Sequence, residues 1–533
     1  MFKRYLVYVL ILAFPSIIFA QKNKVVLGDK DFAKELYDNR NYKKAIDEYL
    51  ILLKTDSTNV TYKHNLALCY LNLNIEKDKT LKLLETVTKQ PKCDPNAWYD
   101  LAFANQRLMR FDDAINYYRK FIELVKNKDK NYIPATRQIE ICENAKVLIK
   151  KPINVSIEFL GNEINSITPD FKPYISADEK FLVFTSKRRG NIGNLIDFDG
   201  FNTSDIFSCN FNNGKWEKPK RLPATINTTF SEDCTGLTAD GSTIVIHYDS
   251  DKTMGDILIS SFKGKSFMRP LDAGSEINSN KDEQAACLSP DKQTMFFSSN
   301  REGGMGAKDL YYSRKLPSGE WTKPVNLGLN INTEYDENYP YIAPDGETLY
   351  FCSVGHNSMG GYDIFKAKWD KLTNTFSKPE NIGFPINTSD DERTISFTQS
   401  GRYAYANAFR KDGIGDRDIC RIIFNDIPPT KTVITGKIII SDSTQSKSKV
   451  SDTMFAIEDI KITVIDKKTA LFKDKCTPDK NSGKYIVNLL PGEYLLKFEG
   501  NTINPFEFEL IIPDRELTEK EIYKDITLIH KKQ

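Results

Sequence analysis

The residues of this chain whose side chains could support metal or nucleophilic chemistry are few and far apart. The four histidines are His64, His247, His356 and His530, and none has a second ligand at a spacing suited to zinc. The run HNSMG at 356–360 holds a serine among small residues but lacks the strand-to-helix setting of a nucleophilic serine. We therefore predict no catalytic, metal-binding or cofactor-binding residues, and we expect that the chain is not an enzyme.

A pair of aspartates could offer oxygen ligands to a calcium ion. Asp197 and Asp199 are followed by Gly200, but the twelve-residue series of ligands with its closing glutamate is missing. We interpret this segment as a solvated loop, with calcium binding as the alternative.

An acidic residue stands five positions after an asparagine in five places along the chain. The pairs are Asn165 and Asp170, Asn227 and Glu232, Asn278 and Glu283, Asn332 and Glu337, and Asn387 and Glu392. In a closed ring of repeats the five carboxylates would surround one mouth of a central channel, where like charges raise each other's pKa. We hypothesise that this acidic ring binds a basic peptide segment or a cation. The alternative is that each carboxylate caps local backbone amides.

These acidic residues belong to a repeat that occurs five times within residues 153–425. Successive opening asparagines are 62, 51, 54 and 55 residues apart, and the long first interval contains extra residues around 191–200. Each copy continues with a turn of the Asp-Gly type and ends with an aspartate before Ile or Leu, such as Asp363. An aspartate needed once per copy is expected to hold the backbone amides of a loop. A unit of this length fits about four short strands.

The fourth copy shows the pattern clearly. Strand patterns at 339–343 and 348–353 flank an Asp-Gly turn, and Phe376 and Pro379 mark an outer strand. These motifs resemble the WD40-like Asp-repeat propellers of the TolB type, which implies a five-bladed β-propeller, with six blades as the alternative. The fifth copy lacks its last strand, whereas Val155–Gly161 precedes the first copy as an unpaired strand pattern. Pairing these two ends would close the ring.

Residues 24–150 show helical periodicity with a period near 34. The third copy carries small and aromatic residues at Trp98, Leu101, Ala102, Ala114 and Tyr118. This pattern resembles the tetratricopeptide repeat and implies an α-helical solenoid with a concave face. By the family's register that face carries Lys34, Tyr37, His64, Tyr99, Phe103 and Arg107. We predict a groove for an extended or helical peptide, and the alternative is that the aromatic residues pack between helices.

Both ends of the chain have recognisable patterns. Residues 1–20 have the charged start, apolar run and small residue of a secretory signal peptide, and no later segment is apolar enough to span a membrane. A linker at 426–431 precedes strand patterns over 432–530, with a polar insertion at 442–452. The hairpin Leu490-Pro491-Gly492-x-Tyr494 resembles carboxypeptidase regulatory-like, or transthyretin-like, β-sandwich modules.

Charge and domain order together point to a class of function. With 74 basic and 72 acidic residues the net charge is +2, which excludes a global attraction to nucleic acid. The domain order resembles periplasmic proteins of Bacteroidota-type bacteria, including accessory proteins of type IX secretion and the OmpA family, here without the OmpA-like domain. We expect an exported periplasmic scaffold, peripheral to the outer membrane, that joins protein partners of the cell envelope. The alternative is a ligand-sensing or carbohydrate-binding propeller module, and contact with peptidoglycan stays open without a residue to support it.

Overall fold

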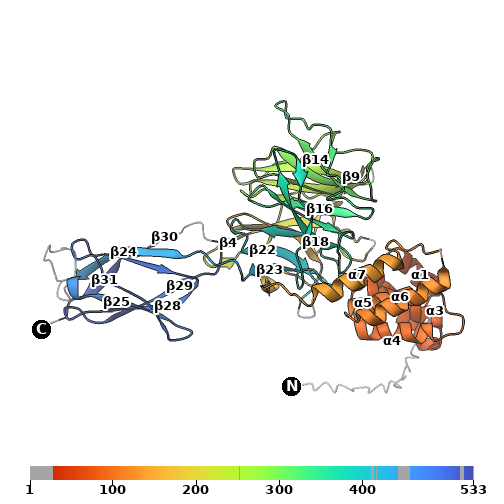
Figure 1. Ribbon diagram of the computed structural model, residues 1–533, viewed down its shortest axis with the longest axis horizontal. Helices are drawn as coiled ribbons and strands as arrows, with labels where there is room; N and C mark the ends of the chain where they lie inside the picture. Colours follow the sequence, from red (N-terminus) through yellow and green to blue (C-terminus); the bar gives the residue numbers. More distant parts are fainter. Residues whose placement is uncertain are drawn as a thin grey trace, which may run out of the picture.

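The computed structural model describes residues 28–126, 128–197, 199–250, 253–409, 413–415, 417–441, 457–516 and 521–531. The predicted signal peptide and the polar insertion at 442–452 lie outside these ranges. Figure 1 shows three parts in a row, with a helical region at one end, a group of sheets in the middle and an elongated pair of sheets at the other end. Among the described residues, no helix is both long and apolar enough to cross a membrane.

The helical region consists of seven α-helices that pack as successive antiparallel neighbours. They are α1 (Lys30–Asp38), α2 (Tyr42–Thr55), α3 (Val60–Leu73), α4 (Lys77–Thr88), α5 (Asn96–Arg107), α6 (Phe111–Val125) and α7 (Ala135–Leu148). The small residues Ala45, Ala102 and Ala114 are fully buried, which lets paired helices approach while Tyr49 and Tyr118 fill the space between them. Asp29 begins α1 by accepting hydrogen bonds from two backbone amides of the first turn.

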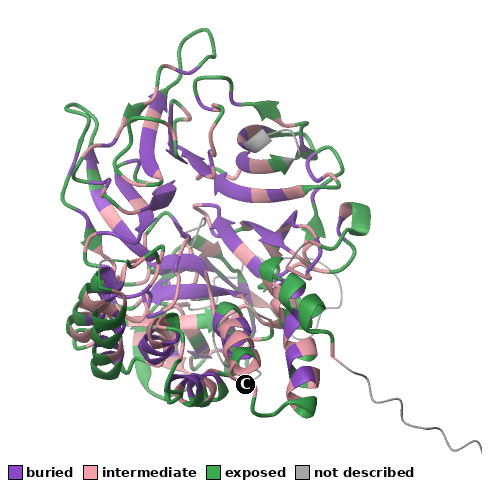
Figure 2. Cartoon of the chain, turned by 90° about the vertical axis from the view of Figure 1, so that its right-hand side faces the viewer, coloured by how far each residue is buried: buried purple, intermediate pink, exposed green. Residues whose placement is uncertain are grey.

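Five antiparallel sheets follow, arranged around a common axis with their inner strands buried (Figure 2). The first holds β2 (Asp170–Ile175), β3 (Phe181–Ser186), β4 (Asp205–Asn212), β5 (Lys215–Trp216) and β6 (Lys220–Arg221). The second holds β7 (Ser231–Leu237), β8 (Thr243–Ser250), β9 (Thr253–Lys263), β10 (Ser266–Phe267) and β11 (Leu271–Asp272). The third holds β12 (Ala285–Leu288), β13 (Thr294–Ser299), β14 (Asp309–Arg314) and β15 (Val325–Asn326).

The last two of these sheets complete the arrangement. The fourth holds β16 (Glu337–Ile342), β17 (Thr348–Ser353), β18 (Asp363–Asp370), β19 (Thr375–Phe376) and β20 (Glu380–Asn381). The fifth has the order β1 (Val155–Phe159), β23 (Asp418–Phe424), β22 (Tyr403–Ala408) and β21 (Ile395–Phe397). The predicted pairing of the first strand with the last is therefore observed, with Ile157 opposite Ile422. A ring closed by its two ends is the architecture of a β-propeller.

The opening asparagine of each copy ties neighbouring sheets together. Asn332 accepts a hydrogen bond from the Leu310 amide at 2.8 Å and donates one to the Leu310 carbonyl at 3.0 Å. The repeated aspartates hold loops, as expected: Asp309 accepts hydrogen bonds from the amides of Met305 and Gly306. Both residue types recur because each sheet needs one bridge to its neighbour and one fixed loop.

Two further sheets form the C-terminal part. One contains β24 (Thr432–Ser441), β27 (Lys484–Leu489), β30 (Glu521–Tyr523) and β31 (Ile526–Ile529), and the other contains β25 (Lys461–Asp466), β26 (Phe472–Cys476), β28 (Gly492–Glu499) and β29 (Phe506–Ile512). Alternate residues such as Ile462, Leu496 and Phe498 are buried in one core between them. β26 cannot be predicted from the sequence, because its residues are mostly charged and lack apolar alternation.

The helical region is attached to the propeller mainly through α7. Arg137, which is 6% exposed, donates hydrogen bonds to the carbonyls of Val354 at 2.8 Å and His356 at 2.9 Å. Asn144 donates to the Ser358 carbonyl, and the fully buried Met359 packs in the helical core. The loop between β17 and β18 is thus held by the helices as much as by its own sheet.

This attachment leads to a prediction. Replacing Arg137 with Ala leaves two buried carbonyls without their charged donor, which costs on the order of 2 kcal/mol. Hydrogen exchange should then become about tenfold faster for the amides of residues 354–362. Lys120→Ala, at an exposed ion pair on α6, is the control and should leave that exchange unchanged. Equal exchange in wild type and Arg137→Ala would show that α7 does not hold this loop.

Candidate functional site

The five carboxylates of the predicted acidic ring lie within their own sheets. Glu337 accepts hydrogen bonds from the Thr333 amide at 2.8 Å, the Thr333 hydroxyl at 2.7 Å and the Ser353 hydroxyl at 2.6 Å. The other four carboxylates cap a backbone amide four residues earlier in the same way: Asp170, Glu232, Glu283 and Glu392. All five are at most 9% exposed. The structure therefore favours local capping, the alternative given above, over an exposed ring of carboxylates.

The physical reason is the alternation of side chains along a strand. In four copies the residue directly after the capping carboxylate is the one that contacts a neighbouring sheet, and in the first copy it is Lys172, two residues after Asp170 at a register shift of β2. Residues next to or near the capping carboxylates, here called the inner ring, are Lys172, Asp233, Gln284, Asn338 and Arg393. Lys172 contacts Asp233 of the next sheet at 2.8 Å, and Asn338 donates to Gln284 of its neighbour at 2.7 Å. The inner ring is thus of mixed charge.

His247 belongs to the same cluster. Burial lowers the pKa of His247 to about 4, and the charge of Lys172 acts in the same direction. Burial would raise the pKa of Asp233, but Lys172 and His247 outweigh it and the net pKa is lowered. A Cβ atom at Gly255 would lie 2.7 Å from His247 Nε2, so the chain requires glycine at this place. No sequence pattern predicts this cluster, since its members share no spacing.

The six predicted groove residues divide into two groups. Lys34 is exposed on α1 and pairs with Asp38 at 2.7 Å, whereas the His64 side chain is only 14% exposed and pairs with Asp100 of α5 at 2.6 Å. Tyr37 is half-buried, with its ring 5.7 Å from that of Tyr42.

The second group lies on α5, where part of the predicted groove is used for packing. Tyr99 donates to the Ile133 carbonyl at 2.7 Å, and the Arg107 guanidinium lies 4.6 Å from the ring of Phe103. Arg107 also approaches Asp390 of the propeller at 3.7 Å. For Tyr99 the alternative of packing holds, and Arg107 takes part in the contact with the propeller.

The proposed calcium ligands are already paired with a cation of the chain. Lys187 Nζ lies 2.9 Å from Asp197 and 2.6 Å from Asp199. An ammonium group thus stands where a calcium ion would have to bind. Across the described ranges no group of three or more His, Cys, Asp or Glu side chains could hold a metal ion.

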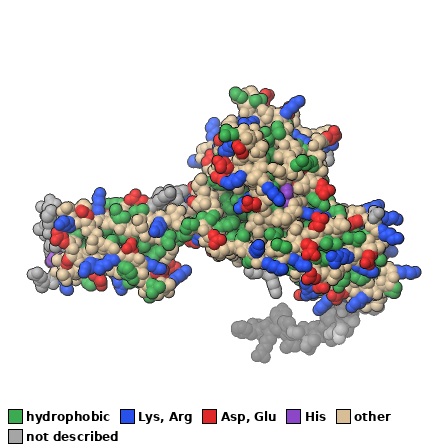
Figure 3. All heavy atoms as spheres, viewed as in Figure 1, with side chains coloured by type: hydrophobic (Ala, Val, Ile, Leu, Met, Phe, Trp, Pro, Cys, Tyr) green, Lys and Arg blue, Asp and Glu red, His purple; other side chains and the backbone are tan. Residues whose placement is uncertain are grey.

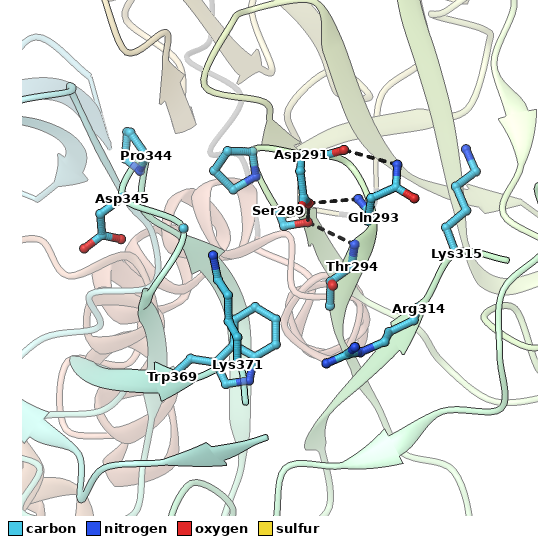
Figure 4. A pocket seen from close by; sticks show the side chains of 12 residues that line it. Ser289, Asp291, Gln293, Thr294, Arg314, Lys315, Pro344, Asp345, Trp369 and Lys371 are labelled. Carbon is cyan, nitrogen blue, oxygen red and sulfur yellow. Dashed lines mark hydrogen bonds between the residues drawn. The ribbon is translucent and has the colours of Figure 1, made fainter. Parts of the chain in front are cut away.

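A pocket of about 400 Å³ lies between the third and fourth sheets, on the side of the Asp-Gly turns. In Figure 4, Trp369 and Lys371 lie across from Ser289, Asp291 and Thr294. The Asp291 carboxylate is engaged by the Ser289 hydroxyl and the Gln293 amide of its own turn. The remaining polar lining is largely cationic, and it includes Arg314, Lys315 and Lys371.

No protein-family model and no curated protein matches this chain. Similar solved structures include TolB from Acinetobacter baumannii (13% identity, 48% of this chain and 55% of that chain, TM-score 0.31). They also include a glycoside hydrolase (9% identity, 52% and 94%, TM-score 0.37) and a Mycobacterium tuberculosis puromycin-hydrolyzing peptidase (12%, 44% and 34%, TM-score 0.27). The chain thus spans about half the length of that TolB, and the β-propeller itself is established by the strand pairing.

These comparisons correct one prediction. The architecture does not justify the expectation that this chain is not an enzyme, because the similar structures include a hydrolase and a peptidase. A fold of this kind carries many functions, so the absence of a recognised motif does not exclude catalysis.

The buried capping carboxylates lead to a prediction on pH. Burial raises the pKa of Glu337 to about 7, above its value in an unfolded chain. The folded state therefore binds this proton more tightly, and stability falls as pH rises from about 4.5 to 7. Urea unfolding at pH 5 and pH 8 should show that Glu337→Gln loses less stability than wild type across this range, by on the order of 2 kcal/mol.

A matched control exists in the same copy. Glu347 is exposed, and Glu347→Gln should leave the pH dependence of wild type unchanged. If Glu337→Gln loses stability as steeply as wild type, the proton on Glu337 is not the source of the effect.

Proposed function

We propose that this chain is an exported periplasmic scaffold that presents a fixed composite surface to protein partners in the cell envelope. In this proposal the helices form a tetratricopeptide solenoid, the five sheets are five propeller blades and the last two sheets are a regulatory-like sandwich. Residues 24–150, 153–425 and 432–530 are the corresponding domains. A role in secretion or gliding would fit such a scaffold.

The observation that carries the proposal is the docking of the helices onto the propeller. The buried guanidinium of Arg137 and the buried side chain of Met359 hold α7 against the fourth sheet. Charged groups buried with their hydrogen bonds satisfied favour a single arrangement of the parts. Lys34 and His64 therefore keep a constant position relative to the propeller, as a preorganised binding surface requires.

The C-terminal part is fixed to the opposite side of the propeller in a similar way. Arg515 places its guanidinium 3.5 Å from the centre of the Phe211 ring and donates to the Glu179 carbonyl at 3.0 Å. Glu179, only 1% exposed, also pairs with Arg421 at 2.6 Å and accepts from the Glu516 amide at 2.7 Å. Both ends of the chain thus hold defined positions on one propeller, which suits a protein that joins others.

The side chains on the outer surface favour a protein partner for the helical end. In Figure 3, Lys and Arg side chains lie among Asp and Glu side chains over the helical region. Lys34 is 67% exposed and available to a partner, since its pairing with Asp38 within one helix turn is weak.

A ligand-binding module is the second candidate, and the pocket of Figure 4 is the observation that favours it. Within the described residues, the buried indole N–H of Trp369, a residue of its lining, has no hydrogen-bond partner. The cations of the lining, Arg314, Lys315 and Lys371, would bind an acidic substituent of a carbohydrate.

The test of the scaffold is affinity capture from a detergent-solubilised envelope of the producing cells. The intact chain is compared with the double variant Lys34→Glu, His64→Gln, in which two groove residues change but Gln can still donate to Asp100. We expect the captured envelope proteins to decrease at least tenfold in the variant, while Lys120→Glu on the outer face of α6 retains them. Capture of glycan without any protein by all three chains would instead support the ligand-binding module.

A further inference from the structure

The helical region meets the propeller at a second place, far from α7. The ammonium of Lys43, on α2, lies 4.2 Å from the centre of the Phe201 ring in the long segment between β3 and β4. The same segment approaches the start of α2 so closely that a Cβ at Gly200 would lie 2.6 Å from Asn41 Oδ1. Gly200 has a φ of +85°, a conformation that favours glycine at this place.

A cleft of about 340 Å³ opens beside this contact, and its walls come from both parts of the chain. The helices contribute the segment before α2 and the end of α3, and the propeller contributes its first and fifth sheets. The lining residues are Arg40, Tyr42, Asn72, Leu73, Pro169, Phe171, Lys187, Asp199, Phe201, Phe409 and Arg417. Interfaces between domains are a preferred location for binding sites, and this volume lies within their usual range.

The chemistry of the lining is aromatic and cationic. Four rings line the cleft, together with three cationic side chains and a single carboxylate. That carboxylate, Asp199, is paired with Lys187 at 2.6 Å, so these two charges largely compensate each other. Arg40 and Arg417 add two guanidinium groups to the lining, and the Arg417 guanidinium lies 4.9 Å from the centre of the Phe409 ring.

The extra residues of the first copy form part of the cleft. The first interval between opening asparagines is 62 residues, whereas the other three are 51, 54 and 55 residues, and the additional segment supplies Asp199, Gly200 and Phe201. It reaches the helices and forms one wall of the cleft. The first copy of the repeat is thus extended at the place where it contacts the helical region.

We propose that this cleft binds an acidic peptide segment of a protein partner. An apolar or aromatic side chain of the segment packs among Tyr42, Phe171, Phe201 and Phe409, and its carboxylates meet Arg40 and Arg417. Charge complementarity favours an anionic occupant, and the rings favour one with an apolar side chain. The proposal rests on the scaffold function and names the chemistry of the partner at one site.

The experiment begins with the intact chain and a displayed library of random decapeptides. We expect selection of peptides that combine Asp or Glu with Phe, Tyr, Trp or Leu. The most enriched peptide is then synthesised with a fluorescent label, and its binding is measured by anisotropy at low and at physiological salt. Affinity should fall with salt, because part of the attraction is between partly exposed charges.

Two variants provide the comparison. Arg40→Glu reverses one charge of the lining and should weaken binding at least tenfold. Arg110→Glu is the matched control, since Arg110 is exposed at the start of α6 as Arg40 is before α2, but it does not line the cleft. This control should bind within twofold of wild type.

Three results would overturn the proposal. They are selection of peptides without acidic residues, equal binding by wild type and Arg40→Glu, and Arg40-dependent binding of polygalacturonate by a chain that selects no peptide. If the Arg40→Glu chain captures every envelope partner of the wild type, this binding site is refuted but the scaffold function is not. Failure of the intact chain to capture any protein refutes the scaffold itself, whatever the peptide measurement shows.

Discussion

The hydrogen bonds of five asparagines are the interaction on which the rest of this structure depends. Each asparagine joins the first loop of one copy to the third strand of the preceding sheet, with an amide donor 2.8 Å from its Oδ1. Asn165 makes this bond to Ile419, which is 254 residues away in the chain. The same local bridge that stacks neighbouring sheets therefore also closes the ring, and β1 follows by pairing with β23.

This dependence explains how much of the fold was predictable. The repeated asparagines and turns resemble those of TolB-type propellers, and that resemblance predicts the β-propeller. The incomplete fifth copy predicts the pairing at its closure. The orientation of individual side chains was harder, because an error of one residue along a strand moves a side chain to the opposite face. The sequence predicts the Glu337 carboxylate at the mouth of the channel. In the structure it caps Thr333, and the neighbouring Asn338 contacts Gln284 of the next sheet.

The helical region shows a different limit of sequence reasoning. Helical periodicity identifies residues that face a groove, but it does not tell which part of the groove the same chain will occupy. Arg107 fits the register of a concave face and lies near Asp390 of the propeller, 283 positions later in the sequence. Contacts of this kind depend on how two folded parts meet, and no local pattern encodes them. The cluster of Lys172, Asp233 and His247 also has no local sequence pattern, because its members meet only when neighbouring sheets pack.

Attachment at both ends of the helical region has a consequence for the surface between the attachments. At α7 the contact is buried and rich in hydrogen bonds, and at α2 the ammonium of Lys43 lies over the Phe201 ring. Arg107, on α5, adds an ion pair with Asp390 of the propeller at 3.7 Å. Because the helices meet the propeller at several places, the walls of the cleft beside Phe201 are held in one relative position, and a segment that binds there meets a preformed surface.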